Sequence, residues 1–214
     1  MYVGILGGTG PAGQALAARL ASVGCDVVIG SRSAERAATV CDELRAKWPV
    51  RELVLKPGTN AEAAEADLIV VATIWEASAT TAASVAGQLR GKTVVSMGNA
   101  LAKIDGELRP VPLPGGSVAA TVQEAAPSAL VATAFNHIPA RDLGRLDRPL
   151  KGDVVVCADH PAAADATIDL VKLVPGLRPI RSGSLALAGT VEGFTAVLIG
   201  INRRAGLRLT GIGD

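Results

Sequence analysis

The sequence predicts an α/β fold, a doubly wound parallel sheet with a smaller C-terminal α/β extension. Short apolar runs rich in β-branched residues alternate with Ala-rich stretches of helical length along the chain. The first run leads into a glycine-rich turn and then directly into a helical stretch. Strands and helices that alternate in this way form parallel sheets covered by helices. We expect residues 1–150 to form the main domain and residues 151–214 the extension.

The first half of the chain holds most of the predicted strands. Apolar runs predict strands at residues 3–6, 26–30, 50–55, 67–72 and 92–96. The stretches between them predict helices at residues 14–24, 33–47, 60–66 and 77–89. Residues 98–116 are rich in Gly and Pro, so we expect an irregular loop over one end of the sheet.

The second half continues the alternation with a changed rhythm. We expect helices at residues 118–125, 161–173 and 190–202, the second of them favoured by a Pro at its start. We expect strands at residues 130–134, 153–158 and 177–181. No linker of low complexity separates the two halves, so the extension should pack on the main domain.

A glycine pattern directly follows the first strand. Gly8, Gly10 and Gly13 are spaced as Gly-x-Gly-x-x-Gly. Gly8 permits the tight turn, Gly10 lets the backbone approach a pyrophosphate, and Gly13 lets the helix pack closely on the strand. In this setting the pattern predicts a Rossmann domain whose first helix points its N-terminus at the phosphates of a dinucleotide. An ordinary strand-to-helix turn of another α/β domain is the alternative.

The end of the second strand indicates which dinucleotide binds. Domains that prefer NAD usually place a carboxylate there for the ribose 2′-hydroxyl. This chain has Ser31 and Arg32 at that point, and Arg36 four residues further on. A hydroxyl and two guanidinium groups can hold a 2′-phosphate, which predicts NADP. The alternative is that both arginines are solvated charges at a helix start, partly neutralised by Glu35.

Composition excludes several other classes of function. Of the 214 residues, 49% are hydrophobic and only 2% aromatic, and the net charge is +1. Aromatic residues are too few for a platform that stacks single-stranded nucleic acid, and the charge is too small to attract nucleic acid or an anionic membrane. Cys25, Cys41 and Cys157 form no CxxC motif, so we expect no metal site and no disulfide.

The same data predict a cytoplasmic protein. Free cysteines are typical of a reducing compartment. The chain enters its first strand at once, so we expect no signal peptide. Residues 185–201 form the longest apolar stretch, but Glu192 interrupts it, and we expect a packing helix there.

Five segments occur in an order that resembles a known family. They are GILGGTGPAG, GSRSAERA, ATIWEA, FNHIPA and GLRPIRSGSL. Together they resemble the F420-dependent NADP reductases, also called F420H2:NADP oxidoreductases, over nearly the whole chain. The last two segments are the most specific part of the resemblance, and the Ala-rich composition is closest to the actinobacterial branch. One departure is that Ile74 and Trp75 are adjacent, where members of the family often have a Pro between them.

The resemblance implies a two-cofactor enzyme. NADP would bind the N-terminal domain, and the deazaflavin coenzyme F420, as co-substrate, would lie in a cleft closed by residues 151–214. The reaction would be reversible hydride transfer between C5 of reduced F420 and C4 of the nicotinamide. Such a step needs no metal and no protein nucleophile, because the cofactors carry the chemistry. A homodimer is expected, and the helix near residues 190–201 offers one face for it.

The resemblance also implies which residues contact the cofactors. The pyrophosphate would be lined by the turn residues Gly8, Thr9, Gly10, Pro11, Ala12 and Gly13, and the 2′-phosphate by Ser31, Arg32 and Arg36. The nicotinamide and its ribose would be flanked by Ile74, Trp75, Asn99, Ala100 and Ala140. Ala205 would approach the deazaflavin.

No residue of the chain is predicted with certainty to be catalytic. Asn136 and His137 are candidates that would hydrogen-bond the ring edge of F420, and the alternative for His137 is a histidine satisfied at a strand end. Arg203, Arg204 and Arg208 either bind the phosphate and polyglutamate tail of F420 or form a solvated helix end.

Two other functions remain open at this point. One is an NADPH-dependent imine or carbonyl reductase without F420, in which His137 would have to supply a proton. The other is a non-catalytic NADP-binding sensor, which the fold alone does not exclude.

Overall fold

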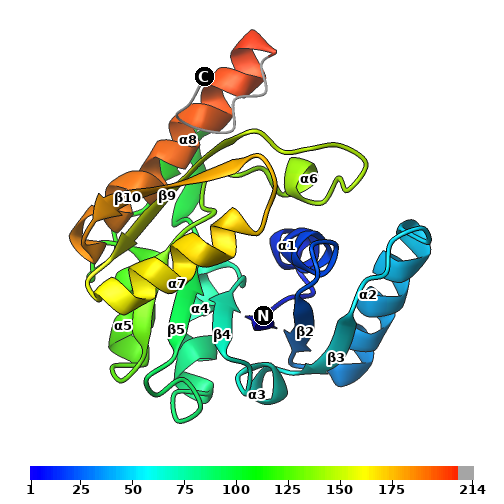
Figure 1. Cartoon of the computed structure of the whole chain (residues 1–214). Helices are drawn as coiled ribbons and strands as arrows, with labels where there is room; N and C mark the ends of the chain where they lie inside the picture. The colour runs from blue at the N-terminus through cyan, green and yellow to red at the C-terminus, as the bar shows by residue number, and fades with distance from the viewer. Residues whose placement is uncertain (207–214) are drawn as a thin grey trace.

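Six parallel strands form the centre of the structure, a computed structural model that describes residues 1–206 (Figure 1). In spatial order they are β3 (Leu55–Thr59), β2 (Asp26–Ser31), β1 (Tyr2–Leu6), β4 (Leu68–Val71), β5 (Thr93–Ser96) and β8 (Leu130–Thr133). The order reverses between β1 and β4, because the chain first adds strands on one side of β1 and then on the other. A crevice at the carboxyl ends of the strands is expected at such a point. The predicted doubly wound fold is confirmed.

Two further strands extend this sheet beyond β8. β9 (Gly152–Ala158) runs antiparallel to β8, pairing Thr133 with Cys157, and β10 (Leu177–Gly183) runs parallel to β9. The described part of the predicted extension is therefore continuous with the main sheet. Its division from residues 1–150 as a separate functional unit stays a prediction.

Helices cover both faces of the sheet. One face packs against α1 (Pro11–Ala21), α2 (Ala34–Lys47), α7 (Pro161–Lys172) and the short α6 (Ala140–Leu143). The other packs against α3 (Asn60–Ala63), α4 (Trp75–Ser84), α5 (Val118–Ala125) and α8 (Ala188–Ala205), which a 3-10 turn at Leu185–Leu187 precedes.

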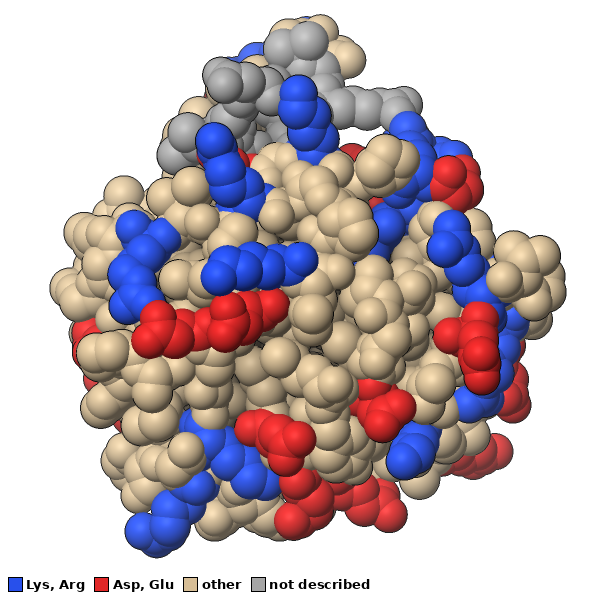
Figure 2. Space-filling model, viewed as in Figure 1, with Lys and Arg blue, Asp and Glu red and all other residues tan. Residues whose placement is uncertain are grey.

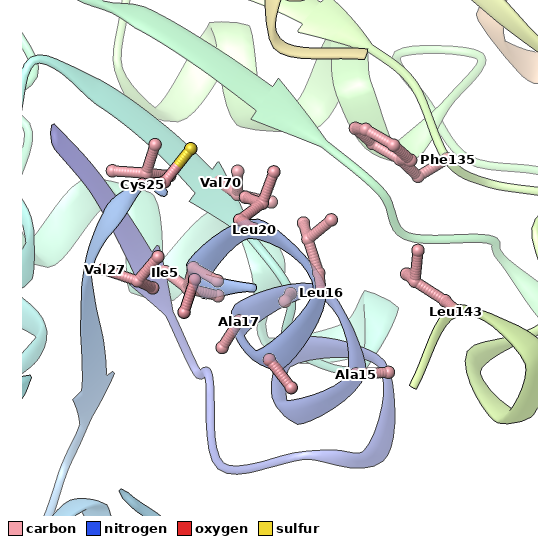
Figure 3. Packing of buried hydrophobic residues seen from close by; sticks show 14 of the residues in the cluster. Ile5, Ala15, Leu16, Ala17, Leu20, Cys25, Val27, Val70, Phe135 and Leu143 are labelled. Carbon is pink, nitrogen blue, oxygen red and sulfur yellow. The ribbon is translucent and has the colours of Figure 1, made fainter. Parts of the chain in front are cut away.

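The first helix anchors the core of one face. Leu16 and Leu20, one turn apart on α1, are fully buried and lie among the side chains of the central strands, such as Ile5 (Figure 3). Phe135 and Leu143, from the segment after β8, belong to the same cluster. Burying one such side chain stabilises the fold by roughly 1.5–3 kcal/mol. The core therefore holds the segment after β8 against α1.

Two predicted elements were wrong. The third strand is β3 at Leu55–Thr59, whereas residues 50–55 were predicted. β3 contains Pro57, which is tolerated because β3 lies at the sheet edge and pairs only with β2. The region predicted as an irregular loop contains an antiparallel hairpin, β6 (Leu101–Ile104) and β7 (Glu107–Pro110). Asp105 and Gly106 join its strands, both with positive φ, as an Asp-Gly hairpin turn requires.

Helix boundaries differ less. α4 begins at Trp75, two residues earlier than predicted, and ends at Ser84; α6 was not predicted. The segment Leu185–Ala205 is long and apolar enough to cross a membrane by length and composition alone. Glu192 and Thr195 of α8 are nevertheless buried in the protein, as in the predicted packing helix.

Close packing of β1 on the helix layer predicts one large effect on stability. A Cβ atom at Gly4 would lie 1.8 Å from the backbone oxygen of Ala63 in α3, so a strand or a helix must move. Gly4→Ala should lower the free energy of unfolding by about 3 kcal/mol. Gly87→Ala is the control, since a Cβ there meets no atom within 4 Å, and it should change stability by less than about 0.5 kcal/mol. Equal urea midpoints for the two variants would contradict this assignment.

Candidate functional site

The carboxyl ends of the parallel strands bring the predicted residues toward one edge of the sheet. The glycine turn follows β1, Ser31 ends β2, Ile74 lies just after β4, and Asn99 and Asn136 follow β5 and β8. Because parallel strands share the edge at which they end, these segments converge on the crevice of the sheet. The contacts below show how closely each one joins its neighbours.

Packing inside the protein accounts for the glycine turn except at one position, Gly10. The backbone N–H of Gly8 donates to the Gly30 carbonyl at 2.9 Å, which holds the turn against β2. A Cβ at Gly13 would lie 2.6 Å from Gly8 Cα, so packing alone requires glycine there. A Cβ at Gly10 would meet no protein atom closer than 3.7 Å. Packing does not explain this glycine, and an open face over its backbone is what a phosphate cradle requires.

The N-terminus of α1 has no side-chain cap among residues 1–206. Gly10 is the N-cap and no side chain caps the helix; Pro11, at its first position, has no N–H to satisfy. The side chain of Gln14 turns back and donates to the Thr9 carbonyl at 2.8 Å, which fixes the turn. Thr9 and Ala12 are partly exposed. Backbone N–H groups and the positive end of the helix dipole therefore face this position.

The end of β2 presents two cations without partners. Ser31 is buried, and its Oγ accepts from the N–H of Ser33 at 3.2 Å. Ser33 in turn caps α2 by accepting from the N–H of Arg36. Arg32 and Arg36 are exposed, and within residues 1–206 neither guanidinium contacts a carboxylate, including that of Glu35. On the face shown in Figure 2, by contrast, Lys and Arg side chains are interspersed with Asp and Glu.

The loop after β4 adjoins the glycine turn. A Cβ at Gly7 would lie 2.3 Å from Cγ2 of Thr73, and the Thr73 hydroxyl hydrogen-bonds that of Ser78 at 3.0 Å. Ile74, the N-cap of α4, is 71% exposed, although it is a large apolar side chain, and the half-buried Trp75 follows it. An exposed aliphatic side chain beside this glycine turn is suited to cover the face of a ligand ring.

A buried amide network joins the ends of β5 and β8. Asn99 Nδ2 donates to the Asn136 carbonyl at 2.7 Å. Asn136 Nδ2 donates to the Gly98 carbonyl at 2.8 Å, and Asn136 Oδ1 accepts from the Thr133 hydroxyl at 2.7 Å. Asn136 is only 5% exposed and its amide is used inside the protein. Ala100, next along the chain, is buried at the base of the hairpin.

His137 is also held inside the protein. It is 6% exposed, and its Nε2 lies 2.7 Å from the Asp153 carbonyl, which can only accept, so Nε2 carries the hydrogen. Burial lowers the pKa of His137, so the ring is neutral near pH 7 and Nδ1 has no hydrogen to donate. Asp153 itself is held by Arg178 at 2.6 and 2.8 Å, which lowers the pKa of that carboxyl. This geometry favours the satisfied histidine; a contact with F420 stays a prediction.

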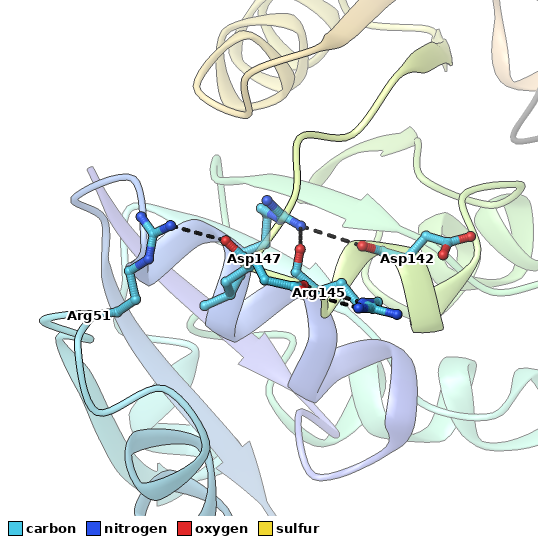
Figure 4. A network of polar contacts seen from close by, with 6 residues as sticks. Arg51, Asp142, Arg145 and Asp147 are labelled. Atoms are coloured by element: carbon cyan, nitrogen blue, oxygen red, sulfur yellow. Dashed lines mark hydrogen bonds and ion pairs between the residues drawn. The ribbon is translucent and has the colours of Figure 1, made fainter.

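Arg19 anchors the segment that contains α6, and sequence reasoning missed it. The side chain is buried, and burial lowers the pKa of its guanidinium. Its Nε donates to the Leu143 carbonyl at 2.9 Å and its Nη2 to the Arg145 carbonyl at 2.5 Å. Figure 4 shows the polar contacts around Arg145, whose side chain also pairs with Asp147. The bonds from Arg19 satisfy carbonyls at the end of α6 and tie it to α1. Ala140, the first residue of α6, is thereby fixed near the segment of Asn136 and His137.

Three other structural contacts had no signal in the sequence. Asn60, the first residue of α3, accepts the N–H of Gly7 at 3.1 Å through Oδ1 and so braces the glycine turn. Glu192 of α8 accepts from the N–H groups of Val118 and Ala119 at 2.9 and 3.2 Å. Thr195, one turn further along α8, contacts the amide network of Asn99 and Asn136.

The predicted residues at the C-terminus do not join this group. Ala205 ends α8 and is exposed, ten residues beyond Thr195, or about 15 Å along the helix axis. Arg203 and Arg204 are exposed at the same end and line a cavity of about 530 Å³ between α8 and the hairpin, where Arg204 is paired with Glu107. Arg208 lies outside the described residues.

Comparison with known proteins relates this chain to one family. The family model "NADP oxidoreductase coenzyme F420-dependent" matches residues 2–100. The F420-dependent NADP reductase of Methanocaldococcus jannaschii is 34% identical over 218 residues, which cover 99% of this chain and 97% of that protein. The F420-dependent NADP reductase of Methanothermobacter marburgensis is also 34% identical, over 99% of both chains.

A solved structure shows the same fold over the whole chain. It comes from Arthrobacter sp. FB24 and superposes on this chain with a TM-score of 0.79. The match covers 100% of this chain and 99% of the other at 24% identity, so it supports the fold alone.

Glu192 predicts a pH-dependent stability. Burial raises the pKa of its carboxyl to about 7 from an ordinary 4.5, against the opposing effect of the two N–H donors. Between these values the folded protein binds more protons than the unfolded chain, so this contribution is present at low pH and lost as pH rises through 7. The stability contribution of Glu192 should fall by about 2.5 kcal/mol between pH 5 and pH 8. His137 acts in the opposite direction, because its lowered pKa makes the unfolded chain bind the extra proton. The neighbouring Cys157 does not titrate in this range, because burial raises the pKa of its thiol.

Glu192→Gln provides the control for this measurement. The variant lacks the titrating group but keeps His137, so the difference in free energy of unfolding between wild type and variant, from urea unfolding at pH 5, 6, 7 and 8, should shrink as the pH rises. It should also be less stable at low pH, because an amide N–H₂ would face the N–H groups of Val118 and Ala119. Parallel profiles for the two proteins would show that Glu192 does not titrate as described.

Proposed function

Because this chain belongs to the family of F420-dependent NADP reductases, we propose that it transfers a hydride reversibly between C5 of reduced coenzyme F420 and C4 of NADP⁺. The protein is an oxidoreductase with NADP and F420 as its two redox partners. The observation that carries the proposal is full-length similarity to these reductases in a chain whose glycine turn leaves Gly10 open at an uncapped helix N-terminus.

The residues around the crevice fit NADP. We assign the pyrophosphate to the turn from Gly8 to Gly13 at the N-terminus of α1, where free N–H groups suit an anion. Ser31, Arg32 and Arg36 are assigned to the 2′-phosphate, because the two arginines follow β2, are exposed and pair with no carboxylate within residues 1–206. Together these groups favour NADP over NAD.

The nicotinamide half is assigned to the loops after β4, β5 and β8. Ile74 and Trp75 would cover one side of the ring and its ribose, and Asn99 and Ala100 the other. Ala140, at the start of α6, is small enough for a ring to approach the backbone. The cofactors supply the hydride chemistry when bound, and the chain supplies the alignment and excludes water.

The position of His137 disfavours an imine or carbonyl reductase without F420. Such a reaction needs a proton donor near the acceptor. The neutral His137 ring gives its one N–H to the Asp153 carbonyl, and burial opposes a second proton. Hydride exchange between two cofactors places no such demand on the protein.

The F420 side of the cleft is assigned to residues 151–214 as a second unit. Arg203 and Ala205 at the end of α8 lie apart from Asn99 and Asn136 within one chain, so an assignment of F420 to them requires a second chain or a long ligand. The phosphate and polyglutamate tail of F420 provide that length, and the exposed Arg203 is a suitable cation for them.

The protein is also proposed to be a cytoplasmic homodimer. Cys25, Cys41 and Cys157 are free and buried, as expected in a reducing compartment. Phe194, Val197 and Ile201 of α8 are each at least 37% exposed, and this apolar face of the helix suits a self-complementary contact.

A direct assay tests the proposed reaction. The protein is mixed with NADPH and oxidised F420, and the absorbance of oxidised F420 is followed. We expect its loss with NADPH and a much slower loss with NADH. Turnover of small imines or carbonyls without F420 turnover would instead identify the alternative reductase, and NADPH binding without any turnover would identify a sensor.

Charge at the end of β2 predicts the choice of cofactor. Replacing Arg32 and Arg36 together with Ala removes two charge-assisted bonds to the 2′-phosphate, so KM for NADPH should rise about ten- to a hundredfold. KM for NADH should change little. Arg90→Ala is the matched control, because Arg90 is also an exposed arginine and lies in the turn before β5, far in sequence from Arg32 and Arg36. An equal loss of affinity for both nucleotides would count against the 2′-phosphate assignment.

A further inference from the structure

Thr195 of helix α8 contacts the segments that follow β5 and β8. Thr195 is 6% exposed, and its hydroxyl lies 3.3 Å from Asn99 Oδ1 and 3.3 Å from the Asn136 carbonyl. Both partners accept hydrogen bonds, so the single hydroxyl hydrogen is shared between them. These contacts join residues that are 96 and 59 positions apart in the chain. No motif of the predicted cofactor site includes this threonine.

The contact fixes how the amide of Asn99 is turned. Asn99 Nδ2 donates one hydrogen to the Asn136 carbonyl at 2.7 Å, and Asn99 Oδ1 faces the hydroxyl of Thr195. A flipped amide would place its oxygen against the Asn136 carbonyl oxygen, which is repulsive, and would lose the bond that the Thr195 hydroxyl donates to Oδ1. One Nδ2 hydrogen of the half-buried Asn99 is then left for a ligand.

A second contact on α8 sets the register of the helix. Glu192, one turn before Thr195, accepts from the N–H groups at the start of α5 with both carboxylate oxygens. Ser117 caps the same helix by accepting from the N–H of Ala120. Two fixed points one turn apart prevent α8 from sliding or rotating relative to the sheet, so the hydroxyl of Thr195 meets the amide network at a defined position.

We propose that Thr195 is a positioning residue for the nicotinamide half of the NADP site: through Asn99 it fixes the polar group that receives the nicotinamide ribose. This inference rests on the proposed assignment of Asn99 to that ribose. It assigns to the C-terminal helix a role in binding NADP, in addition to the role proposed for this part of the chain toward F420.

Thr195→Val tests the proposal, because valine keeps the shape of threonine and removes the hydroxyl. The Kd for NADP⁺, measured by isothermal titration calorimetry, should rise about three- to tenfold, the effect of one misplaced hydrogen bond. The Kd for adenosine 2′,5′-bisphosphate, which lacks the nicotinamide ribose, should not change. Thr195→Ser restores the hydroxyl and should restore the wild-type Kd for NADP⁺. Thr190→Val, the same change at an exposed position of α8, is the control.

The outcomes separate positioning from general stability. A variant that weakens both ligands equally, or neither, overturns the proposal. Should Thr195→Val not fold, Thr195→Ala makes the same comparison without added strain, because Ala favours the helix. Calorimetry needs no F420, so a wild-type protein inactive toward F420 would refute the proposed reaction and leave this test intact. With an active enzyme, KM for NADPH should rise in Thr195→Val and KM for F420 should not.

Discussion

The turn after β8 is the constraint on which the rest of the structure depends. Phe135 has φ of 64°, a left-handed conformation that costs a residue with a side chain roughly 1–2 kcal/mol. It persists because the Phe135 side chain is buried in the core cluster to which α1 also contributes, and because Asn136, the next residue, is bonded at both ends of its amide. The chain leaves the parallel sheet at this turn, and β9 then enters beside β8 in the opposite direction.

Several anchors from distant parts of the chain converge on the segment that follows. Arg19 of α1 binds its carbonyls near α6, the Asp153 carbonyl of β9 holds His137, and Thr195 of α8 contacts the Asn136 carbonyl. Each bond satisfies a buried polar group that would otherwise cost about 1–3 kcal/mol. The segment from Phe135 to Ala140 is therefore held by the sheet and by helices that cover the two faces of the sheet. The segment itself has little regular structure.

Features that depend on residues close together in the chain were predicted from the sequence. Features that depend on residues far apart in the chain were not. The glycine turn, the helix α2 and the two arginines after β2 are local patterns, and the structure has them where they were predicted. The bonds of Asn60, Arg19 and Thr195 join residues 53, 124 and 96 positions apart, and no local pattern announces them. Edge strand β3 was misplaced because Pro57 and Gly58 argue against a strand, whereas the Asp105-Gly106 hairpin carried a turn signal that could have been used.

The two halves of the proposed NADP site differ in physical character. At the 2′-phosphate end, Arg32 and Arg36 are exposed charges, so their attraction for the cofactor is strong at low ionic strength and screened by salt. At the nicotinamide end, Asn99 and Asn136 lie in a network of hydrogen bonds that is largely buried and so little screened. Affinity can thus come mainly from the exposed end and alignment from the buried end. That division suits a reaction in which the protein donates no proton, because hydride transfer depends on bringing two carbons to about 3–3.5 Å in the right orientation.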